Sequence, residues 1–357
     1  MKKISYLIIL IIIAATMILG CKSKRETKAE NVILMIGDGM GLPDIYAAMT
    51  VSEKPLNIER CNITGLQKTF SSDSYITDSG AAGTALATGS KTKNGVIGMD
   101  FQGNRIKSIL EIAEEHSLAT GLVSTSSITH ATPAAFISHQ LDRGNYEEIA
   151  MDFLKTDIDL FIGGGYDHFA KRADKLNLID SLKFRGYEVC TSMSMILKST
   201  SSKLAGFTAA DQNPYRLNGR GDMLPESTGK AIELLSKNKN GFFLMIEGAQ
   251  MDWAAQPDNA DTLVDETLDF DKAAGIALDF AQKEGHTLVV ITADHETGGV
   301  TIIDGDLQSH KVKLNFSSGH TAVMVPVYAY GPGAEKFTGI YDNTDIFKKI
   351  LASFNFE

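Results

Sequence analysis

Cysteine is scarce in this sequence. The 357-residue chain has three cysteines, and only Cys61 and Cys190 lie beyond residue 21. A small fold held together by several disulfides is therefore excluded. Outside the cytoplasm these two residues could form one disulfide, or both could stay free in the interior. The sequence leaves both alternatives open.

Positive charge is also in deficit. The sequence has 34 Lys and Arg against 44 Asp and Glu, which gives a formal net charge of −10 at pH 7. Phosphate backbones and anionic membrane surfaces repel such a chain, so we expect no nucleic-acid partner. Internal repeats are missing as well. Because 43% of the residues are hydrophobic, we expect one large domain over residues 31–357 with a sizeable core.

The long apolar run of this chain lies at its N-terminus. Lys2 and Lys3 precede it, it extends over residues 4–20, and Cys21 follows directly. This order is similar to a bacterial lipoprotein signal, which predicts that residues 1–20 are removed and that Cys21 is lipidated. Loss of the two lysines changes the formal charge from −10 to −12.

A lipidated Cys21 has consequences for the location of the protein. Residues 21–30 would form a charged tether to a membrane of the cell envelope, on the periplasmic side or at the outer surface. The alternative is a single membrane-spanning anchor, because the run is just long enough to cross a bilayer.

Beyond the tether, apolar β-branched segments alternate with helical patterns. We expect strands at 31–36, 119–124, 159–163, 242–246, 287–292 and 325–330, and helices at 106–115, 146–154, 226–236 and 260–284. This alternation predicts an α/β fold with a mostly parallel central sheet and helices on both faces. Residues 192–224 show no clear period, which favours a surface excursion.

Acidic side chains follow three of the predicted strands. Asp38 stands between glycines at residues 36–41, Glu247 follows the strand at 242–246, and Asp294 and His295 follow the strand at 287–292. The carboxyl ends of parallel strands meet at one edge of a sheet, so these residues are expected to converge there. Asp38 is either a metal ligand or part of a turn. The glycines here do not form a dinucleotide-binding fingerprint. That motif is Gly-x-Gly-x-x-Gly, and in this sequence the third glycine comes one position too early.

Ser79 begins a run of small residues at 79–87. A hydroxyl at the start of a helix is a candidate nucleophile if a metal ion or a base activates it, and a simple helix cap is the alternative. Taken singly, Arg143 and Asp252 could be surface charges and His320 a loop histidine.

Taken together, six motifs resemble those of the alkaline phosphatase family. They lie in the family's order at residues 31–41, 77–79, 129–134, 246–252, 292–295 and 318–321, and the resemblance covers nearly all of the chain beyond the N-terminal segment. The resemblance implies an alkaline-phosphatase-like fold that hydrolyses small phosphate monoesters with two zinc ions and one magnesium ion. The oligomer expected for such a chain is a homodimer.

The resemblance also assigns roles by position. It implies that Ser79 is the phosphorylated nucleophile and that Arg143 clamps the phosphate, with Asp78, His130 and Trp253 close by. It implies one zinc site of Asp38, Asp294 and His295, a second of Asp252 and His320, and a magnesium site of Asp38, Thr132 and Glu247. Four carboxylates carry four negative charges and three divalent cations carry six positive charges. The site then has two positive charges in excess, which suits a phosphate dianion.

Three positions depart from the family pattern. Gln256 stands where the family usually has a histidine for the second zinc. Gln256 itself, Asp258, water or a small shift of another group could complete that shell. His130 stands where some relatives have aspartate, and Trp253 where some have lysine or histidine.

The expected reaction is phosphomonoester hydrolysis through a phosphoserine at Ser79, with retention at phosphorus. The alternatives are a phosphodiesterase of the same superfamily and a non-catalytic lipoprotein that binds metal or phosphate. A sulfatase is excluded because the Cys-x-Pro-x-Arg motif of those enzymes is missing around Ser79.

Overall fold

The computed structural model describes residues 28–317 and 319–356. The predicted signal segment, Cys21, most of the predicted tether and Ser318 of the last motif lie outside the described residues. Within the described chain, both Cys61 and Cys190 are free thiols, which decides between the two alternatives left open by the sequence. No helix in these ranges has the length and apolar character needed to cross a membrane.

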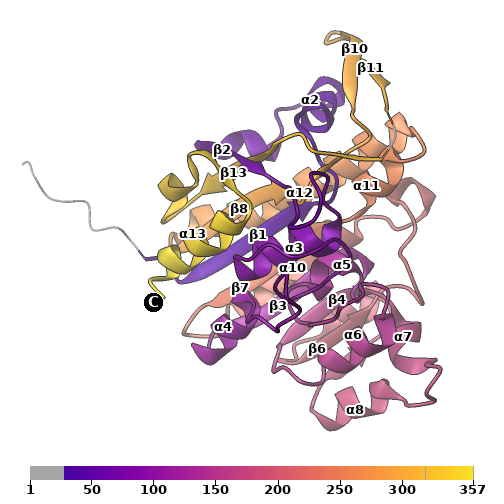
Figure 1. Ribbon diagram of the computed structural model, residues 1–357, viewed down its shortest axis with the longest axis vertical. Coiled ribbons are helices and arrows are strands. Elements are labelled where there is room, and N and C mark those ends of the chain that lie inside the picture. Colours follow the sequence, from indigo (N-terminus) through magenta and orange to yellow (C-terminus); the bar gives the residue numbers. More distant parts are fainter. Residues whose placement is uncertain (1–27, 318, 357) are drawn as a thin grey trace, which may run out of the picture.

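A ten-stranded sheet forms the centre of the fold, in the order β14-β2-β13-β8-β1-β7-β3-β4-β6-β5 (Figure 1). The strands are β1 (Asn31–Gly37), β2 (Ile63–Lys68), β3 (Ala119–Ser127), β4 (Leu160–Gly164), β5 (Glu188–Cys190), β6 (Leu204–Phe207), β7 (Phe242–Gly248), β8 (Thr287–Ala293), β13 (Val325–Tyr330) and β14 (Gly339–Asp342). Strand β13 runs antiparallel to both of its neighbours, and every other neighbouring pair is parallel. The predicted mostly parallel sheet is confirmed.

Helices cover both faces of this sheet, as predicted. One face carries α3 (Ser79–Thr88), α4 (Ile109–Glu115), α5 (Ala131–Ala134), α6 (Tyr146–Asp152), α7 (Tyr166–Ala170), α8 (Leu178–Phe184) and α13 (Thr344–Phe354). The other face carries α2 (Leu42–Val51), α9 (Met193–Lys198), α10 (Met223–Leu235), α11 (Gln250–Ala255) and α12 (Ala260–Glu284).

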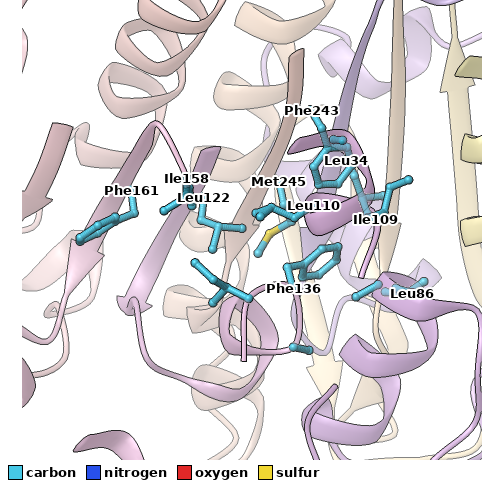
Figure 2. Packing of buried hydrophobic residues seen from close by; sticks show 14 of the residues in the cluster. Leu34, Leu86, Ile109, Leu110, Leu122, Phe136, Ile158, Phe161, Phe243 and Met245 are labelled. Carbon is cyan, nitrogen blue, oxygen red and sulfur yellow. The ribbon is translucent and has the colours of Figure 1, made fainter. Parts of the chain in front are cut away.

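Two hydrophobic cores result from the alternation of side chains along the strands. On β1, Leu34 faces the first core, whereas its neighbours Ile33 and Met35 face the second. Figure 2 shows part of the first core, where Leu34 and Phe243 of neighbouring strands lie above Phe136. Strands buried on both faces read as continuous apolar runs, which explains why the sequence identified them.

The six predicted strands and the predicted helix at 260–284 are confirmed, and the helix pattern at 106–115 begins three residues later in the structure, at α4. The prediction for residues 192–224 is wrong. Strand β6 lies inside this stretch, is fully buried, and pairs with β4 and β5 in the main sheet. Four residues are too few to show a period, so the strand could not be distinguished from a loop.

Smaller elements complete the described chain. They are the 3₁₀ helices η1 (Asn57–Arg60), η2 (Arg216–Asn218) and η3 (Ala334–Phe337), the pair β9 (Glu296–Thr297) and β12 (His320–Thr321), and the hairpin β10 (Thr301–Asp306) and β11 (Lys311–Asn315). The hairpin projects from one end of the molecule in Figure 1.

Candidate metal and phosphate site

The register of the sheet brings the predicted acids together. Ile36 at the end of β1 pairs with Glu247 on one side and with Thr292 on the other, so the ends of three parallel strands are level. Asp38 follows β1, and Asp294 follows β8, at the same edge of the sheet. The pairing of β12 with β9 then places His320 opposite Thr297, next to this edge. The convergence expected from the sequence is confirmed.

Ser79 is the first residue of α3 and is 3% exposed. Asp78 is the residue that caps this helix, since its carboxylate accepts a hydrogen bond of 2.9 Å from the backbone N–H of Ala81. The alternative that Ser79 is the cap is therefore wrong. Its hydroxyl is directed instead at the site, where Oγ lies 3.3 Å from Nε2 of His295.

Among the described residues, three overlapping groups of side chains could each hold a metal ion, because in each group the ligand atoms lie within 4.8 Å of one another. The groups are Asp38 with Asp294 and His295, Asp252 with His295 and His320, and Asp38 with His130 and Glu247. The first matches the predicted zinc site beside Ser79. The second adds His295 to the predicted pair of Asp252 and His320. The third joins His130 to Asp38 and Glu247 of the predicted magnesium site, and it does not include Thr132.

The buried oxygens of these groups fit divalent cations. Both carboxylate oxygens of Asp38, one oxygen each of Asp294 and Glu247, and the hydroxyl of Thr132 are buried without a hydrogen-bond partner among the described residues. A buried polar atom without a partner costs about 1–3 kcal/mol, and more when it is charged. Five such atoms at one edge of a sheet are the donor set expected of a metal centre.

The pKa values point the same way. Burial raises the pKa of Asp38 well above its ordinary value, and the charges of Asp294, Asp252 and Glu247 raise it further. Burial likewise raises the pKa of Glu247 to about 7, although hydrogen bonds from Ser124 and Ser126 oppose the shift. Bound cations stabilise the ionised form of such clustered acidic groups most strongly, because the cations offset the repulsion between the carboxylates.

His320 is oriented for binding through Nε2. Its Nδ1 lies 3.0 Å from the carbonyl oxygen of Thr77, which can only accept, so the proton is assigned to Nδ1. Nε2 lies 3.3 Å from Oδ1 of Asp252. Burial alone would lower the pKa of His320, but the hydrogen bond and the charge of Asp252 raise it to about 9.

Arg143 is held against Asp78 at the start of α3. Its Nη1 donates to Oδ2 of Asp78 at 2.9 Å, and the same carboxylate oxygen accepts from the backbone of Gly95 at 3.0 Å. Asp78 therefore caps the helix of Ser79 and fixes the guanidinium beside it. The structure thus places Asp78, Ser79 and Arg143 side by side at the start of α3.

His130 lies closer to the acids than the sequence indicated. Burial lowers its pKa to about 3, and the charge of Arg143 adds to the effect, so the ring is neutral and able to bind a metal ion. Its ring also meets that of Trp253 edge to face, with centroids 5.5 Å apart. The two departures from the family pattern at these positions thus contact each other.

Gln256 reaches the second group through a hydrogen bond. Its Nε2 donates to Oδ2 of Asp252 at 2.8 Å, and the side chain is otherwise exposed. Asp258 is exposed and belongs to none of the three groups found among the described residues. In this arrangement Gln256 supports the carboxylate of Asp252.

Some supporting residues were missed by the sequence reasoning. Thr297 donates to Oδ1 of Asp252 at 2.5 Å and lies 3.2 Å from Nδ1 of His295, so it joins two groups. Ser126 donates to Glu247 at 3.1 Å. The sequence carried one indication of each: β3 changes from apolar to polar residues at its carboxyl end, and polar residues follow the apolar strand β8 up to Thr297 in β9.

Together these groups are the parts of a metal-assisted phosphoryl-transfer hydrolase. They are a serine hydroxyl at a helix start, an adjacent arginine and three overlapping carboxylate–imidazole groups. The comparisons with known proteins agree. The family model for alkaline phosphatase matches residues 29–315, and the chain belongs to the alkaline phosphatase family. It is an enzyme that hydrolyses phosphate monoesters.

Several relatives are similar over nearly their whole length. Alkaline phosphatase 4 of Bacillus subtilis (strain 168) is 36% identical over 411 residues, covering 90% of this chain and 88% of the relative. Alkaline phosphatase of Escherichia coli (strain K12) is 33% identical, with 93% and 87% covered. The structure of alkaline phosphatase from the Antarctic bacterium TAB5 is 41% identical and has a TM-score of 0.89, covering 93% of this chain and all of the other.

Proposed function

We propose that the protein hydrolyses phosphate monoesters through a phosphoserine at Ser79, with two zinc ions and one magnesium ion. The observation that carries the proposal is the position of the Ser79 hydroxyl, 3.3 Å from Nε2 of His295. His295 belongs to two of the three groups that could hold a metal ion.

In this proposal each group has its own ion. Asp38, Asp294 and His295 would hold the zinc nearest Ser79. Asp252 and His320 would hold the second zinc, and Asp38, Thr132 and Glu247 the magnesium. A variant of the TAB5 enzyme with a histidine replaced by aspartate has magnesium in its M3 site, which supports magnesium as a cofactor in the family.

Bound divalent ions would supply Lewis acidity, which lowers the pKa of a hydroxyl and balances charge on a phosphoryl group. The chain supplies the other parts. Ser79 forms a bond to phosphorus while the alcohol leaves, and water later releases phosphate from the serine. Arg143, held by Asp78, binds two phosphate oxygens through its planar guanidinium. The N-terminus of α3 adds backbone N–H groups toward the same anion.

Turnover of an aryl phosphate by the purified chain tests this function. We expect hydrolysis that is lost after treatment with a chelator, because four clustered carboxylates would repel a phosphate dianion, and that returns when zinc and magnesium are added together. A matched aryl phosphodiester should be turned over far more slowly. Preference for the diester would favour the phosphodiesterase alternative. Metal binding without turnover of either ester would favour a non-catalytic binding protein.

The role of Gln256 gives a further prediction. Its side chain already reaches Asp252, so a histidine at this position can approach the second zinc. We expect Gln256→His to bind the more weakly held zinc at least about tenfold more tightly, since imidazole is a better zinc ligand than an amide. Zinc content after dialysis against graded chelator measures this. The exposed Gln308→His serves as control, and unchanged retention in Gln256→His would place the side chain outside the coordination shell.

We also propose that Cys21 is lipidated and anchors the enzyme at the cell envelope. The support is the order of Lys2, Lys3, an apolar run over residues 4–20, and Cys21. An enzyme facing the periplasm or the outer surface would meet phosphate monoesters before they enter the cell.

A further inference from the structure

The last turn of α11 lacks one of its own hydrogen-bond donors. This helix carries Asp252 and Trp253 toward the site, and Pro257 follows it closely. In a regular helix the N–H of residue 257 would bond the carbonyl of Trp253, four residues earlier. Proline has no N–H, so the chain cannot satisfy this carbonyl in the usual way.

The backbone carbonyls before and after that of Trp253 accept hydrogen bonds from backbone N–H groups. Asp258 has a φ of +58°, and its N–H donates to Ala255 at 3.2 Å, while Asn259 donates to Ala254 at 2.9 Å. This is a Schellman-type end of a right-handed helix: a residue just after the helix adopts a left-handed conformation, and two backbone N–H groups donate to carbonyls of the last turn. The N–H of Gln256 donates to Asp252 at 3.2 Å. Neither arrangement provides for the carbonyl of Trp253.

Tyr215 supplies the donor from another segment. Its hydroxyl donates to the carbonyl oxygen of Trp253 at 3.0 Å. Tyr215 lies between β6 and α10, directly before the 3₁₀ helix η2. The hydroxyl of a side chain distant in sequence therefore takes the place of the backbone N–H that Pro257 removes.

The segment around Tyr215 is firmly anchored, so it can act as a fixed support. The backbone N–H of Arg216 donates to Glu266 of α12 at 2.7 Å. Arg220, with a side chain only 1% exposed, binds Glu266 and lies 2.8 Å from Asp269. On the other side, Gln250 of α11 donates to the carbonyl of Asn213 at 2.6 Å. Buried ion pairs of this kind are costly to break, which holds the segment in one place.

We propose that Tyr215 is a positioning residue for the Asp252 side of the site, because its hydrogen bond to the Trp253 carbonyl fixes the helix turn that presents Asp252 and Trp253. The inference rests on the proposed binding of zinc by Asp252 and His320. Tyr215 itself contacts neither substrate nor metal in this account. Its effect passes through the backbone of α11.

Trp253 provides a direct readout, since it is the only tryptophan of the sequence. Its fluorescence reports on the turn that Tyr215 supports, with no need for turnover. In the Tyr215→Phe variant we expect a shifted emission of the metal-free protein and greater access of a small quencher to Trp253. Zinc titration followed by this emission should show the weaker of the two sites bound about tenfold less tightly, as expected when a partly buried carbonyl loses its hydrogen-bond donor.

Two further variants separate positioning from general stability. Tyr341→Phe removes a similar bond, from a tyrosine hydroxyl to the carbonyl of Phe337 at 2.8 Å, at the β14 edge of the sheet. It should leave the emission and the zinc titration unchanged. Pro257→Ala restores the missing N–H, so the double variant Tyr215→Phe/Pro257→Ala should recover most of the wild-type zinc affinity.

The outcomes are distinct. Wild-type emission and zinc affinity in Tyr215→Phe would overturn the inference, and so would a defect that Pro257→Ala leaves uncorrected. A wild-type chain that binds no zinc would contradict the proposed function instead. In that case the emission and quencher access of the metal-free variants still decide whether Tyr215 positions α11.

Discussion

The Ser79→Ala variant is expected to lose at least about 1,000-fold in turnover of an aryl phosphate, which corresponds to about 4 kcal/mol of transition-state stabilisation. The reason is that alanine removes the atom that forms the bond to phosphorus, while the metal-binding side chains stay in place. The same variant should form no phosphoenzyme. Steady-state turnover, with metal content measured on the same samples, checks the prediction.

Two controls accompany this variant. Ser353→Ala removes another buried serine hydroxyl, which donates to Lys349 at 2.8 Å in α13, and should retain activity. Arg143→Ala should lose only about 10- to 100-fold in kcat/KM, because it removes charge-assisted hydrogen bonds and leaves the nucleophile intact. Equal losses in Ser79→Ala and Arg143→Ala would contradict the separate roles assigned to them.

Asp38→Asn has the second large expected effect. Asp38 is fully buried, belongs to two of the three groups and has two oxygens without a hydrogen-bond partner among the described residues. Its amide analogue has nearly the same shape but no charge, so two metal sites are weakened together. We expect a loss of activity of at least about 100-fold, with a matching fall in bound zinc and magnesium, because carboxylate is the ligand these ions require here.

The same variant should have the opposite effect on the stability of the metal-free protein. Burial raises the pKa of Asp38 in the folded state above its ordinary value of 3.8, so metal-free wild type loses stability as the pH rises above that value. Asparagine does not titrate. Metal-free Asp38→Asn should therefore melt at a higher temperature than metal-free wild type at about pH 8, with a difference that shrinks as the pH falls toward about 4.

Asp44→Asn is the matched control for Asp38→Asn. Asp44 is also fully buried, and burial raises its pKa to about 8, but it belongs to none of the three groups of described residues. It should therefore keep both metals and activity. Loss of metal from Asp44→Asn, or retention of all metals in Asp38→Asn, would contradict the assigned ligands.

The strands and the acids after them could be predicted for a shared physical reason. A strand buried on both faces must be apolar, so a charged residue directly after it is conspicuous, as with Asp38 and Asp294. Parallel strands then bring such residues to one edge without any further information. The roles of Ser79 and Arg143 needed the family motifs, since a serine before a small-residue helix and an isolated arginine have ordinary structural explanations.

The parts that could not be predicted depend on contacts between distant segments. Strand β6 is too short to show a period, and its burial follows only from the neighbouring strands. The approach of His130 to Asp38 and Glu247 depends on how α5 packs beside the sheet. The bond from Tyr215 to the backbone of Trp253 leaves no pattern in the sequence, because a backbone carbonyl can accept from any donor that the fold brings near it.

The central claim is that Ser79 is the group that becomes phosphorylated. Its most direct test is to mix the metal-loaded enzyme with labelled phosphate or an aryl phosphate, quench with acid, digest the protein and locate the phosphorylated residue by mass spectrometry. We expect phosphate on Ser79 in the wild type and none in Ser79→Ala. Phosphate on another residue, or none in an enzyme that turns over, would contradict it.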